Sequence, residues 1–267
     1  MLIAQITDMH VKEKGMRAFG QVDTGARLAR CVARLCALDP LPDAVVATGD
    51  LVDEGTVAEY EHLRKLLSPL PMPVYLIPGN HDEREAMRRV FGDWGHLPAR
   101  GFLQYAIEDF PVRIVALDTL IPGEPGGRLC SGRLKWLSKT LAAAPDRPTI
   151  VIMHHPPFNT GIEHMDGMNC EGADGLARVI VKNPQVERIL CGHVHRAVQV
   201  RFAGTIASIG PSTAFQVALD LRPDSRPGWT EEPAAFQLHL WREGDGVASH
   251  IFYVEADDRP RPFRAEG

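Results

Sequence analysis

Val-Tyr-Leu-Ile-Pro-Gly-Asn-His-Asp, at residues 74–82, is the stretch of this sequence that says most about its fold. Residues 74–77 are apolar, and their β-branched and aromatic side chains are typical of a short buried strand. A proline and a glycine follow, and then come three polar side chains that can bind protons or metals, Asn80, His81 and Asp82. A strand that ends in such groups is typical of a ligand site at the carboxyl edge of a parallel sheet.

Four more apolar runs, on either side of this stretch, end in the same way. Residues 2–7 lead to Asp8 and His10, residues 44–48 to Asp50, residues 149–153 to His154, and residues 186–190 to His193 and His195. Because the carboxyl ends of parallel strands share one edge of a sheet, we expect these side chains to meet there. Each part alone has an ordinary explanation, such as a turn or helix cap for Asp50 or a buried, hydrogen-bonded pair for His154 and His155. None of these ordinary explanations accounts for five strands that all end in such side chains.

The spacing and the residue types indicate a metal site. Alternate side chains of an extended segment point the same way, so Asp8 is expected beside His10, and His193 beside His195. Mixed carboxylate, imidazole and amide groups suit zinc, manganese or iron and do not suit a calcium cage. Glycines next to the candidate ligands suit tight turns and close approach of the backbone: Gly49, Gly79 and Gly192.

The rest of the chain alternates short apolar strands with amphipathic helices, which predicts a layered α/β domain. Further strands are expected at residues 102–108 and 112–117, and helices at residues 25–38, 56–67, 83–91, 132–144 and 172–182. After about residue 196 only strands are expected, at residues 198–202, 205–208, 236–241 and 248–254. Residues 222–233 contain three prolines and are expected to form a loop or flap.

The overall composition argues against several classes of protein. The chain has 267 residues, of which 45% are hydrophobic, enough for one sizeable core. Its net charge of -5 argues against a binder of nucleic acid duplexes, which usually carries a basic face. No basic leader precedes a long apolar stretch and no apolar run approaches ~20 residues, so we expect neither a signal peptide nor a membrane helix. The five cysteines lack the spacing of a zinc site, which indicates reduced thiols in a cytoplasmic protein.

The ordered motifs resemble those of the calcineurin-like metallophosphoesterase superfamily, whose pattern is D-x-H, G-D, G-N-H-[DE], H and G-H-x-H. Every element of that pattern is present within about the first 200 residues. Residues 77–82, residues 154–157 and the pair Met165-Asp166 further resemble the bacterial class III cyclic nucleotide phosphodiesterase and glycerophosphodiesterase group. The resemblance implies a layered α/β/β/α sandwich with a small C-terminal β appendage.

On this basis we divide the chain into three parts. Residues 1–200 are expected to form the catalytic domain, residues 201–255 to complete the sheet and form a cap or dimerisation element, and residues 256–267 to form a flexible tail. Residues 236–241 alternate apolar and polar side chains, and an exposed edge there would pair with a second subunit. Since the resembled group often forms dimers or higher oligomers, we expect a homo-oligomer.

The resemblance also implies two divalent metal ions, manganese, iron or zinc, with Asp50 between them. One ion would be held by Asp8, His10, Asp50 and His195, and the other by Asp50, Asn80, His154 and His193. Water bound to such ions loses a proton near neutral pH, and the bridging hydroxide would attack phosphorus. Asp50 and His81 are therefore the expected catalytic residues, and Asn80, His81 and His195 are expected to contact the substrate.

Several neighbouring residues keep two interpretations. His81 would stabilise the phosphate or protonate the leaving group, or would only orient Asn80. Asp82 would cap the following helix or orient a ligand. His155 is expected to be structural rather than functional, and Asp118 to be a turn residue or a partner of a ligand. The remaining histidines of this part of the chain are expected at the surface: His62, His96 and His164.

The expected reaction is hydrolysis of small phosphodiesters, either cyclic nucleotides or glycerophosphodiesters. A phosphomonoesterase of the same fold is the alternative, because both reactions use the same metal centre. The loops at residues 159–171 and 214–232 would shape the pocket that separates the two. The negative net charge and the lack of an added DNA-binding domain disfavour a nuclease. A non-catalytic scaffold would be expected to have lost ligands, and here none is missing.

Overall fold

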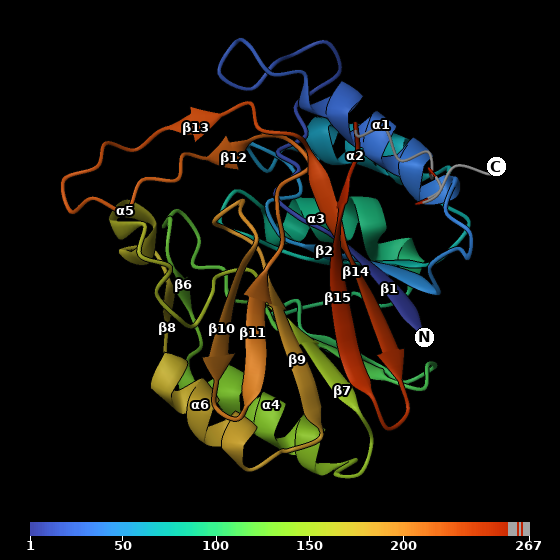
Figure 1. Ribbon diagram of the computed structural model, residues 1–267, viewed down its shortest axis with the longest axis vertical. Coiled ribbons are helices and arrows are strands. Elements are labelled where there is room, and N and C mark those ends of the chain that lie inside the picture. Colours follow the sequence, from blue (N-terminus) through green and yellow to red (C-terminus); the bar gives the residue numbers. More distant parts are fainter. Residues whose placement is uncertain (256–260, 262, 264–267) are drawn as a thin grey trace.

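The protein folds as two β-sheets that lie face to face between two layers of helices (Figure 1). The computed structural model describes residues 1–255, 261 and 263.

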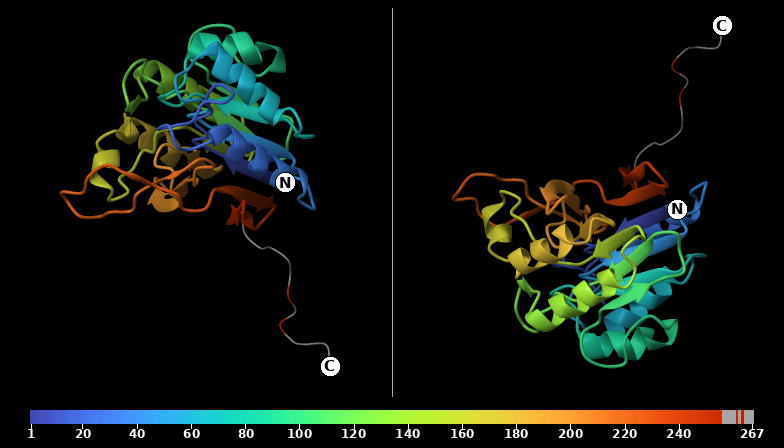
Figure 2. Two further views of the ribbon diagram at one scale, coloured as in Figure 1. Left: turned by 90° about the horizontal axis from the view of Figure 1, so that it is seen from above. Right: turned by 90° about the horizontal axis from the view of Figure 1, so that it is seen from below.

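The first sheet has the strand order β15-β14-β1-β2-β3. Its strands are β1 (Leu2–Ile6), β2 (Ala44–Thr48), β3 (Val74–Ile77), β14 (Ala235–Arg242) and β15 (Gly246–Tyr253). Strands β1, β2 and β3 are parallel, whereas β14 and β15 run antiparallel to their neighbours. The C-terminal hairpin therefore extends the sheet beyond the N-terminal strand, and Figure 2 shows the two side by side.

The second sheet has the strand order β10-β11-β9-β7-β5-β4. Its strands are β4 (Tyr105–Ile107), β5 (Arg113–Ala116), β7 (Thr149–Ile152), β9 (Val186–Cys191), β10 (Val198–Phe202) and β11 (Thr205–Ile209). The four inner strands are parallel, and the two edge strands are antiparallel to them.

Five helices cover the outer faces of the sheets. Helices α1 (Thr24–Cys36), α2 (Val57–Leu67) and α3 (Arg84–Phe91) pack on the first sheet, and α4 (Ser131–Ala142) and α6 (Ala173–Val181) on the second. Helix α2 begins where Thr56 and Glu59 form a reciprocal capping box. The other elements are short: β6 (Gly127–Arg128), β8 (Cys170–Glu171), β12 (Gln216–Val217), β13 (Trp229–Thr230), α5 (Glu163–Asp166) and η1 (Gly92–Trp94).

Alternate residues of the central strands supply separate apolar layers. In β2, Val45 and Ala47 pack against the helices, while Ala44 and Val46 face the second sheet. Strand β7 divides its side chains in the same way between the second helix layer and the space between the sheets. Strands buried on both faces read as continuous apolar runs, as these do in the sequence. The predicted α/β/β/α sandwich is confirmed.

The predicted helices and longer strands are confirmed with small changes at their ends. The strand expected at residues 102–108 is too long, because the backbone N–H of Leu103 donates to the Asp118 carboxylate at 2.8 Å and not to a neighbouring strand. The two-residue strands and the four-residue α5 were not predicted, because segments this short carry no recognisable period.

The expectation that residues 236–241 form an exposed edge is wrong. These residues lie in β14, which is paired on both sides, with β1 and with β15. The outer strand of this sheet is β15, where Ile251 is 43% exposed and Tyr253 is 50% exposed.

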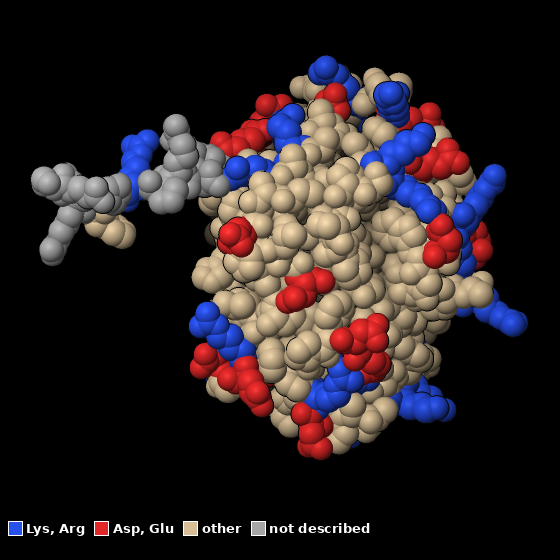
Figure 3. Space-filling model, turned by 90° about the vertical axis from the view of Figure 1, so that its right-hand side faces the viewer, with Lys and Arg blue, Asp and Glu red and all other residues tan. Residues whose placement is uncertain are grey.

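The proposed division at residues 200 and 201 stays a prediction, and the boundary falls within β10. The tail expected at residues 256–267 lies outside the described residues, apart from 261 and 263. Within the described part of the chain, every helix is too short or too polar to cross a membrane. On the face shown in Figure 3, lysines and arginines lie among aspartates and glutamates without a continuous basic stripe.

Candidate metal centre

The carboxyl ends of β1, β2, β3, β7 and β9 converge between the two sheets. The structure brings together all seven side chains predicted as metal ligands, and all except Asn80 are buried: Asp8, His10, Asp50, Asn80, His154, His193 and His195. The first sheet contributes four of them and the second sheet three. The centre therefore forms only when the two sheets pack on each other in this relative position.

The first candidate group consists of Asp8, His10, Asp50 and His195, whose potential ligand atoms all lie within 4.8 Å of one another. The Nε2 atoms of His10 and His195 are 3.2 Å apart. An Asp50 carboxylate oxygen lies 3.7 Å from His10 Nε2, and an Asp8 oxygen lies 3.5 Å from His195 Nε2. Two carboxylates and two imidazoles thus point at one small volume.

The second candidate group consists of Asp50, Asn80, His154 and His193. The Asn80 side-chain oxygen lies 3.2 Å from His154 Nε2 and 3.0 Å from His193 Nδ1. The Asp50 oxygen that faces His10 is also 3.4 Å from His154 Nε2. Asp50 therefore belongs to both groups and joins them into one centre.

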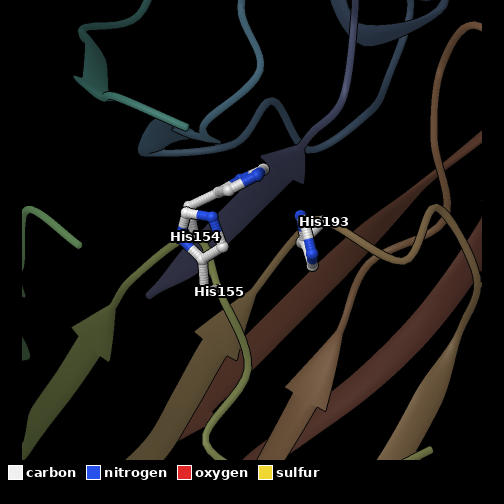
Figure 4. Close-up of side chains that lie close together, drawn as sticks. All are labelled: His154, His155 and His193. Carbon is white, nitrogen blue, oxygen red and sulfur yellow. The ribbon is translucent and has the colours of Figure 1, made fainter. Parts of the chain in front are cut away.

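His155 is close to the second group but is engaged elsewhere. Figure 4 shows His154 and His155 side by side after β7, with His193 facing them from the end of β9. One ring nitrogen of His155 lies 2.8 Å from the Thr119 hydroxyl, and the other lies 3.2 Å from the Pro125 carbonyl oxygen. His155 therefore anchors the loop after β5, and both of its nitrogens are already used.

The residues fit divalent metal ions. Hydrogen-bond partners outside the centre hold the ligand histidines so that a ring nitrogen with a free lone pair faces into it. The Nδ1–H groups of His154 and His195 donate to the carbonyl oxygens of Thr48 and Phe215, both at 2.8 Å, and His10 Nδ1 lies 3.1 Å from an Asp53 oxygen. In the neutral rings each Nε2 then carries a lone pair. Two such lone pairs, on His10 and His195, face each other at 3.2 Å, an arrangement that a cation stabilises.

The backbone is strained at the same positions. Among the described residues, seven other than glycine have a positive φ, and five of them are predicted ligands: Asp8 (51°), His10 (44°), Asp50 (46°), His193 (75°) and His195 (59°). A left-handed backbone at a residue with a side chain costs of order 1–3 kcal/mol. Strain that gathers at ligand positions is typical of a functional site that the surrounding fold holds in place.

Two of the predicted glycines are required by close contacts. A Cβ on Gly79 would lie 2.2 Å from an Asp50 carboxylate oxygen and 2.3 Å from the Asp50 nitrogen. Gly49 has φ +91°, and a Cβ there would lie 2.4 Å from His154 Nδ1. Neither position has room for a side chain, so the candidate ligands can approach one another.

Burial and mutual charge set the protonation of the centre. Burial lowers the pKa of His193 to about 3 and that of His195 to about 4. Burial also acts to lower the pKa of His154, but the Asp50 charge outweighs it and raises the value to about 9. For Asp50, burial acts to raise the pKa, but the charge and hydrogen bond of His154 hold it well below its usual value. The centre thus holds ionised carboxylate and mostly neutral imidazole, the forms that bind metals.

His81 stands beside the centre with one nitrogen free. Its Nδ1–H donates to the Asp53 carbonyl oxygen at 2.7 Å, its backbone N–H donates to Asp50 at 2.9 Å, and its side chain is 40% exposed. Burial acts to lower its pKa, but the Asp50 charge and the Asp53 carbonyl raise it. Sequence reasoning missed Asp53, which supports both His10 and His81. Its only signal is its position three residues after Asp50.

Asp82 supports the turn that carries Asn80. One of its oxygens accepts hydrogen bonds from the backbone N–H groups of Gly79 and Leu51, at 2.8 and 3.1 Å, and the other accepts the Tyr60 hydroxyl at 2.7 Å. Helix α3 is capped by Glu83, so the interpretation of Asp82 as the cap is wrong.

Asp118 is fully buried and forms two hydrogen bonds to Arg84, both at 2.7 Å. It therefore joins β5 to the start of α3 and contacts no candidate ligand in these bonds. The histidines expected at the surface are partly buried: His62, His96 and His164. His62 Nδ1 donates to the Lys12 carbonyl at 2.7 Å, so that expectation is wrong for His62 at least.

Comparison with known proteins identifies the family of this chain. The sequence profile of the calcineurin-like phosphoesterases matches residues 1–197, about three quarters of the chain. The chain belongs to the calcineurin-like phosphoesterase family. Members of this family are metallophosphoesterases, and the matched residues of this family member include all of the strand ends described above.

Named relatives of this calcineurin-like phosphoesterase match it almost end to end. A probable glycerophosphodiester phosphodiesterase of Arcobacter nitrofigilis is 40% identical over 267 residues, covering 100% of this chain and 98% of that protein. The 3′,5′-cyclic adenosine monophosphate phosphodiesterase of Escherichia coli K12 is 31% identical and covers 98% of this chain and 93% of that protein. A dimetal phosphatase from Danio rerio shares the fold, with a TM-score of 0.66 at 13% identity, covering 95% of this chain and 99% of that chain.

Proposed function

We propose that this chain hydrolyses small phosphodiesters with two divalent metal ions held in the two candidate groups. The observation that carries the proposal is the place of Asp50, which lies 3.7 Å from His10 and 3.4 Å from His154 and so joins the groups. The diester preference is supported by the relatives, named for glycerophosphodiester and cyclic nucleotide hydrolysis, that match nearly the whole chain. Manganese, iron or zinc suits this mixture of carboxylate, imidazole and amide.

The two groups give the proposed ligand sets. One ion is assigned to Asp8, His10, Asp50 and His195, and the other to Asp50, Asn80, His154 and His193. When bound, such ions lower the pKa of water and polarise phosphoryl oxygens, which supplies hydroxide and Lewis acidity at neutral pH. The ions bring four positive charges, and Asp8 and Asp50 cancel only two, so the site attracts an anionic phosphate.

His81 is the proposed acid of the reaction. Its Nδ1–H is fixed on the Asp53 carbonyl, so its Nε2 is the atom left to hold or release a proton. Its raised pKa favours the protonated form, which donates to a phosphate oxygen or to the leaving alkoxide. Asn80 and His195 are the other proposed contacts to the substrate.

Hydrolysis of bis(p-nitrophenyl) phosphate and of p-nitrophenyl phosphate, measured side by side, tests the proposal. The protein is stripped with chelator and then supplied with manganese, zinc or iron. We expect cleavage that depends on added metal, with a higher kcat/KM for the diester. Asp50→Asn should abolish it, because it removes the charge that both groups share, whereas Asp146→Asn, at an exposed position, should not.

Each other outcome has a defined meaning. A higher kcat/KM for the monoester would make the protein a phosphomonoesterase of the same fold. If the folded protein cleaves neither ester and binds no stoichiometric metal, the result would support the hypothesis of a non-catalytic scaffold. Cyclic nucleotides and glycerophosphodiesters then identify the substrate if the diester is preferred.

We also propose that the protein forms a homo-oligomer and is located in the cytoplasm. The outer strand β15 exposes Ile251 and Tyr253, and an unpaired strand edge is a usual site of subunit contact. All five cysteines are unpaired, in keeping with a reducing compartment. A monomeric mass in light scattering at micromolar concentration would contradict the oligomer.

A further inference from the structure

Three aromatic side chains form a cluster in which one ring lies against two proposed metal ligands. This aromatic cluster consists of Phe19, Phe215 and Trp229. The Phe215 ring is 5% exposed, and its centroid lies 5.2 Å from that of His10 and 4.8 Å from that of His195. Phe215 therefore lies between the metal centre and the other two rings of the cluster.

Phe19 contacts both Phe215 and Trp229 and yet remains exposed to solvent. Its centroid lies 5.0 Å from that of Phe215 and 5.4 Å from that of Trp229, to which it is stacked at 18°. Its side chain is nevertheless 57% exposed. The backbone of Phe19 has φ 54°, a conformation that bulky residues rarely adopt. The loop between β1 and α1 therefore accepts strain to present an aromatic face beside the catalytic centre.

We propose that the exposed face of Phe19 is a stacking platform for the aromatic base of a nucleotide substrate whose phosphate lies at the metal centre. This inference rests on the proposed function and names a class within it, the diesters that carry a nucleobase. One ring contact of about 5 Å separates Phe19 from Phe215, and a second separates Phe215 from His10. A base stacks on any aromatic face that is rigid and accessible.

The cluster suits a base better than the quaternary ammonium of a choline headgroup. Such a cation is bound by rings that surround it. Here Phe19 and Trp229 are stacked on each other at 18°, so these two rings do not enclose a ligand between them. Two acidic side chains of the neighbouring flap are also paired, Glu231 with Arg27 and Glu232 with Arg196. Because their charges are already balanced by arginines, these two carboxylates offer little attraction to a ligand cation.

Direct binding to the metal-loaded protein tests the platform without turnover. Calorimetry compares adenosine 5′-monophosphate with ribose 5-phosphate, which differ only by the base, on the wild type, Phe19→Ala and Phe19→Trp. Loss of one stacking contact weakens binding by about 5- to 150-fold, and the exposure of Phe19 places the expected effect near the lower end. Phe19→Ala should weaken binding of the nucleotide alone, and Phe19→Trp should restore it.

Met16→Ala is the matched control, because Met16 lies in the same loop and is 59% exposed. It should bind both probes as the wild type does. The KM for 3′,5′-cyclic AMP should rise in Phe19→Ala by a similar factor with little change in kcat, while the KM for glycerophosphoethanolamine stays the same.

Several results would overturn the platform. These are equal wild-type affinity for the two probes, equal weakening of both by Phe19→Ala, the same effect from Met16→Ala, or an effect confined to glycerophosphocholine. If the wild type cleaves no diester, the proposed function fails, but the difference between the two probes still decides whether the base is recognised.

Discussion

Asp53 shows how one residue outside the proposed ligand set can control two that matter. Its carboxylate faces His10 Nδ1 at 3.1 Å, and its carbonyl oxygen accepts the His81 Nδ1–H at 2.7 Å. A carboxylate behind a ligand imidazole fixes the ring and makes it a stronger base. The side chain and the backbone of Asp53 therefore have separate effects, which a substitution can distinguish.

Asp53→Asn should weaken metal binding by about 10- to 100-fold, because it removes the charge behind His10 but keeps the carbonyl behind His81. Activity measured against metal concentration should shift to higher metal and reach nearly the wild-type kcat at saturation. Glu54→Gln is the control, since its carboxylate pairs with Lys12 and is 66% exposed. A loss of kcat that excess metal does not restore would contradict a role limited to positioning His10.

His81→Gln should lower kcat by about 10²- to 10⁴-fold while metal content stays unchanged, because His81 supplies a proton and no metal ligand in the proposed mechanism. If the proton goes to the leaving group, the loss should be smaller for a p-nitrophenyl ester, whose leaving group needs no protonation, than for an alkyl ester. Metal analysis decides the alternative. A variant that lost metal would show that His81 mainly orients Asn80.

The sequence predicted the side chains of the candidate ligands but not the backbone carbonyl groups that orient them. The seven candidate ligands were readable because each follows an apolar run, and the structure brings all of them together. The carbonyl oxygens of Thr48 and Phe215, which orient His154 and His195, have no signature, since every residue carries one. The place of Phe215 depends on the fold of the chain after β11, which brings its carbonyl to His195, twenty residues earlier in the sequence.

The turns between elements are as constrained as the ligands, and the glycine after β3 gives a direct test. Gly79→Ala should destabilise the protein by about 1–3 kcal/mol and reduce metal binding, because the new methyl group would overlap Asp50. Thermal unfolding with and without metal measures both effects. Gly92→Ala is the control: nothing lies within 4 Å of its added Cβ and its φ is -60°, so it should be neutral or slightly stabilising. Equal loss in both variants would contradict the overlap.

Long elements were predictable because they repeat a period, whereas short ones depend on contacts made elsewhere. The apolar runs of β2, β3 and β7 predicted strands that are buried on both faces. Strand β4 is shorter than its sequence suggests because Asp118, distant in the chain, takes the Leu103 N–H. Strands β6 and β8 pair with each other next to the loop after β5, where His155 contacts Thr119 and Pro125.

The two sheets are joined by a buried polar network that was not predicted from the sequence. Gln5 of β1 donates to the Thr48 hydroxyl of β2 at 2.9 Å and to the Cys191 carbonyl of β9 at 2.8 Å. Its oxygen lies 3.1 Å from His239 Nε2 in β14, and His239 Nδ1 lies 2.8 Å from the Ser249 hydroxyl in β15. This network links the C-terminal hairpin to three of the strands that carry the metal centre, β1, β2 and β9.

The network predicts how the stability of the whole molecule depends on pH. His239 is 1% exposed, and burial, helped by the charge of Arg188, lowers its pKa to about 3. The folded value lies below the unfolded value of about 6.5, so the folded state favours the neutral ring. Its contribution to stability is complete above pH 6.5 and falls by about 1.4 kcal/mol per pH unit as the pH drops toward 3.

Urea unfolding of the metal-free protein at pH 7.5 and pH 5 measures this dependence in the wild type, in His239→Gln and in His250→Gln. Gln keeps a donor and an acceptor at position 239 but cannot take up a proton, so the loss of stability on acidification should be smaller in His239→Gln than in the wild type. His250 is exposed on the same hairpin, and its charge adds to the effects that lower the pKa of His239, so His250→Gln should change the slope less than His239→Gln does. The candidate ligand histidines titrate equally in all three proteins, so they cancel in the comparison. Identical slopes for His239→Gln and the wild type would show that another buried group sets the acid limit of the fold.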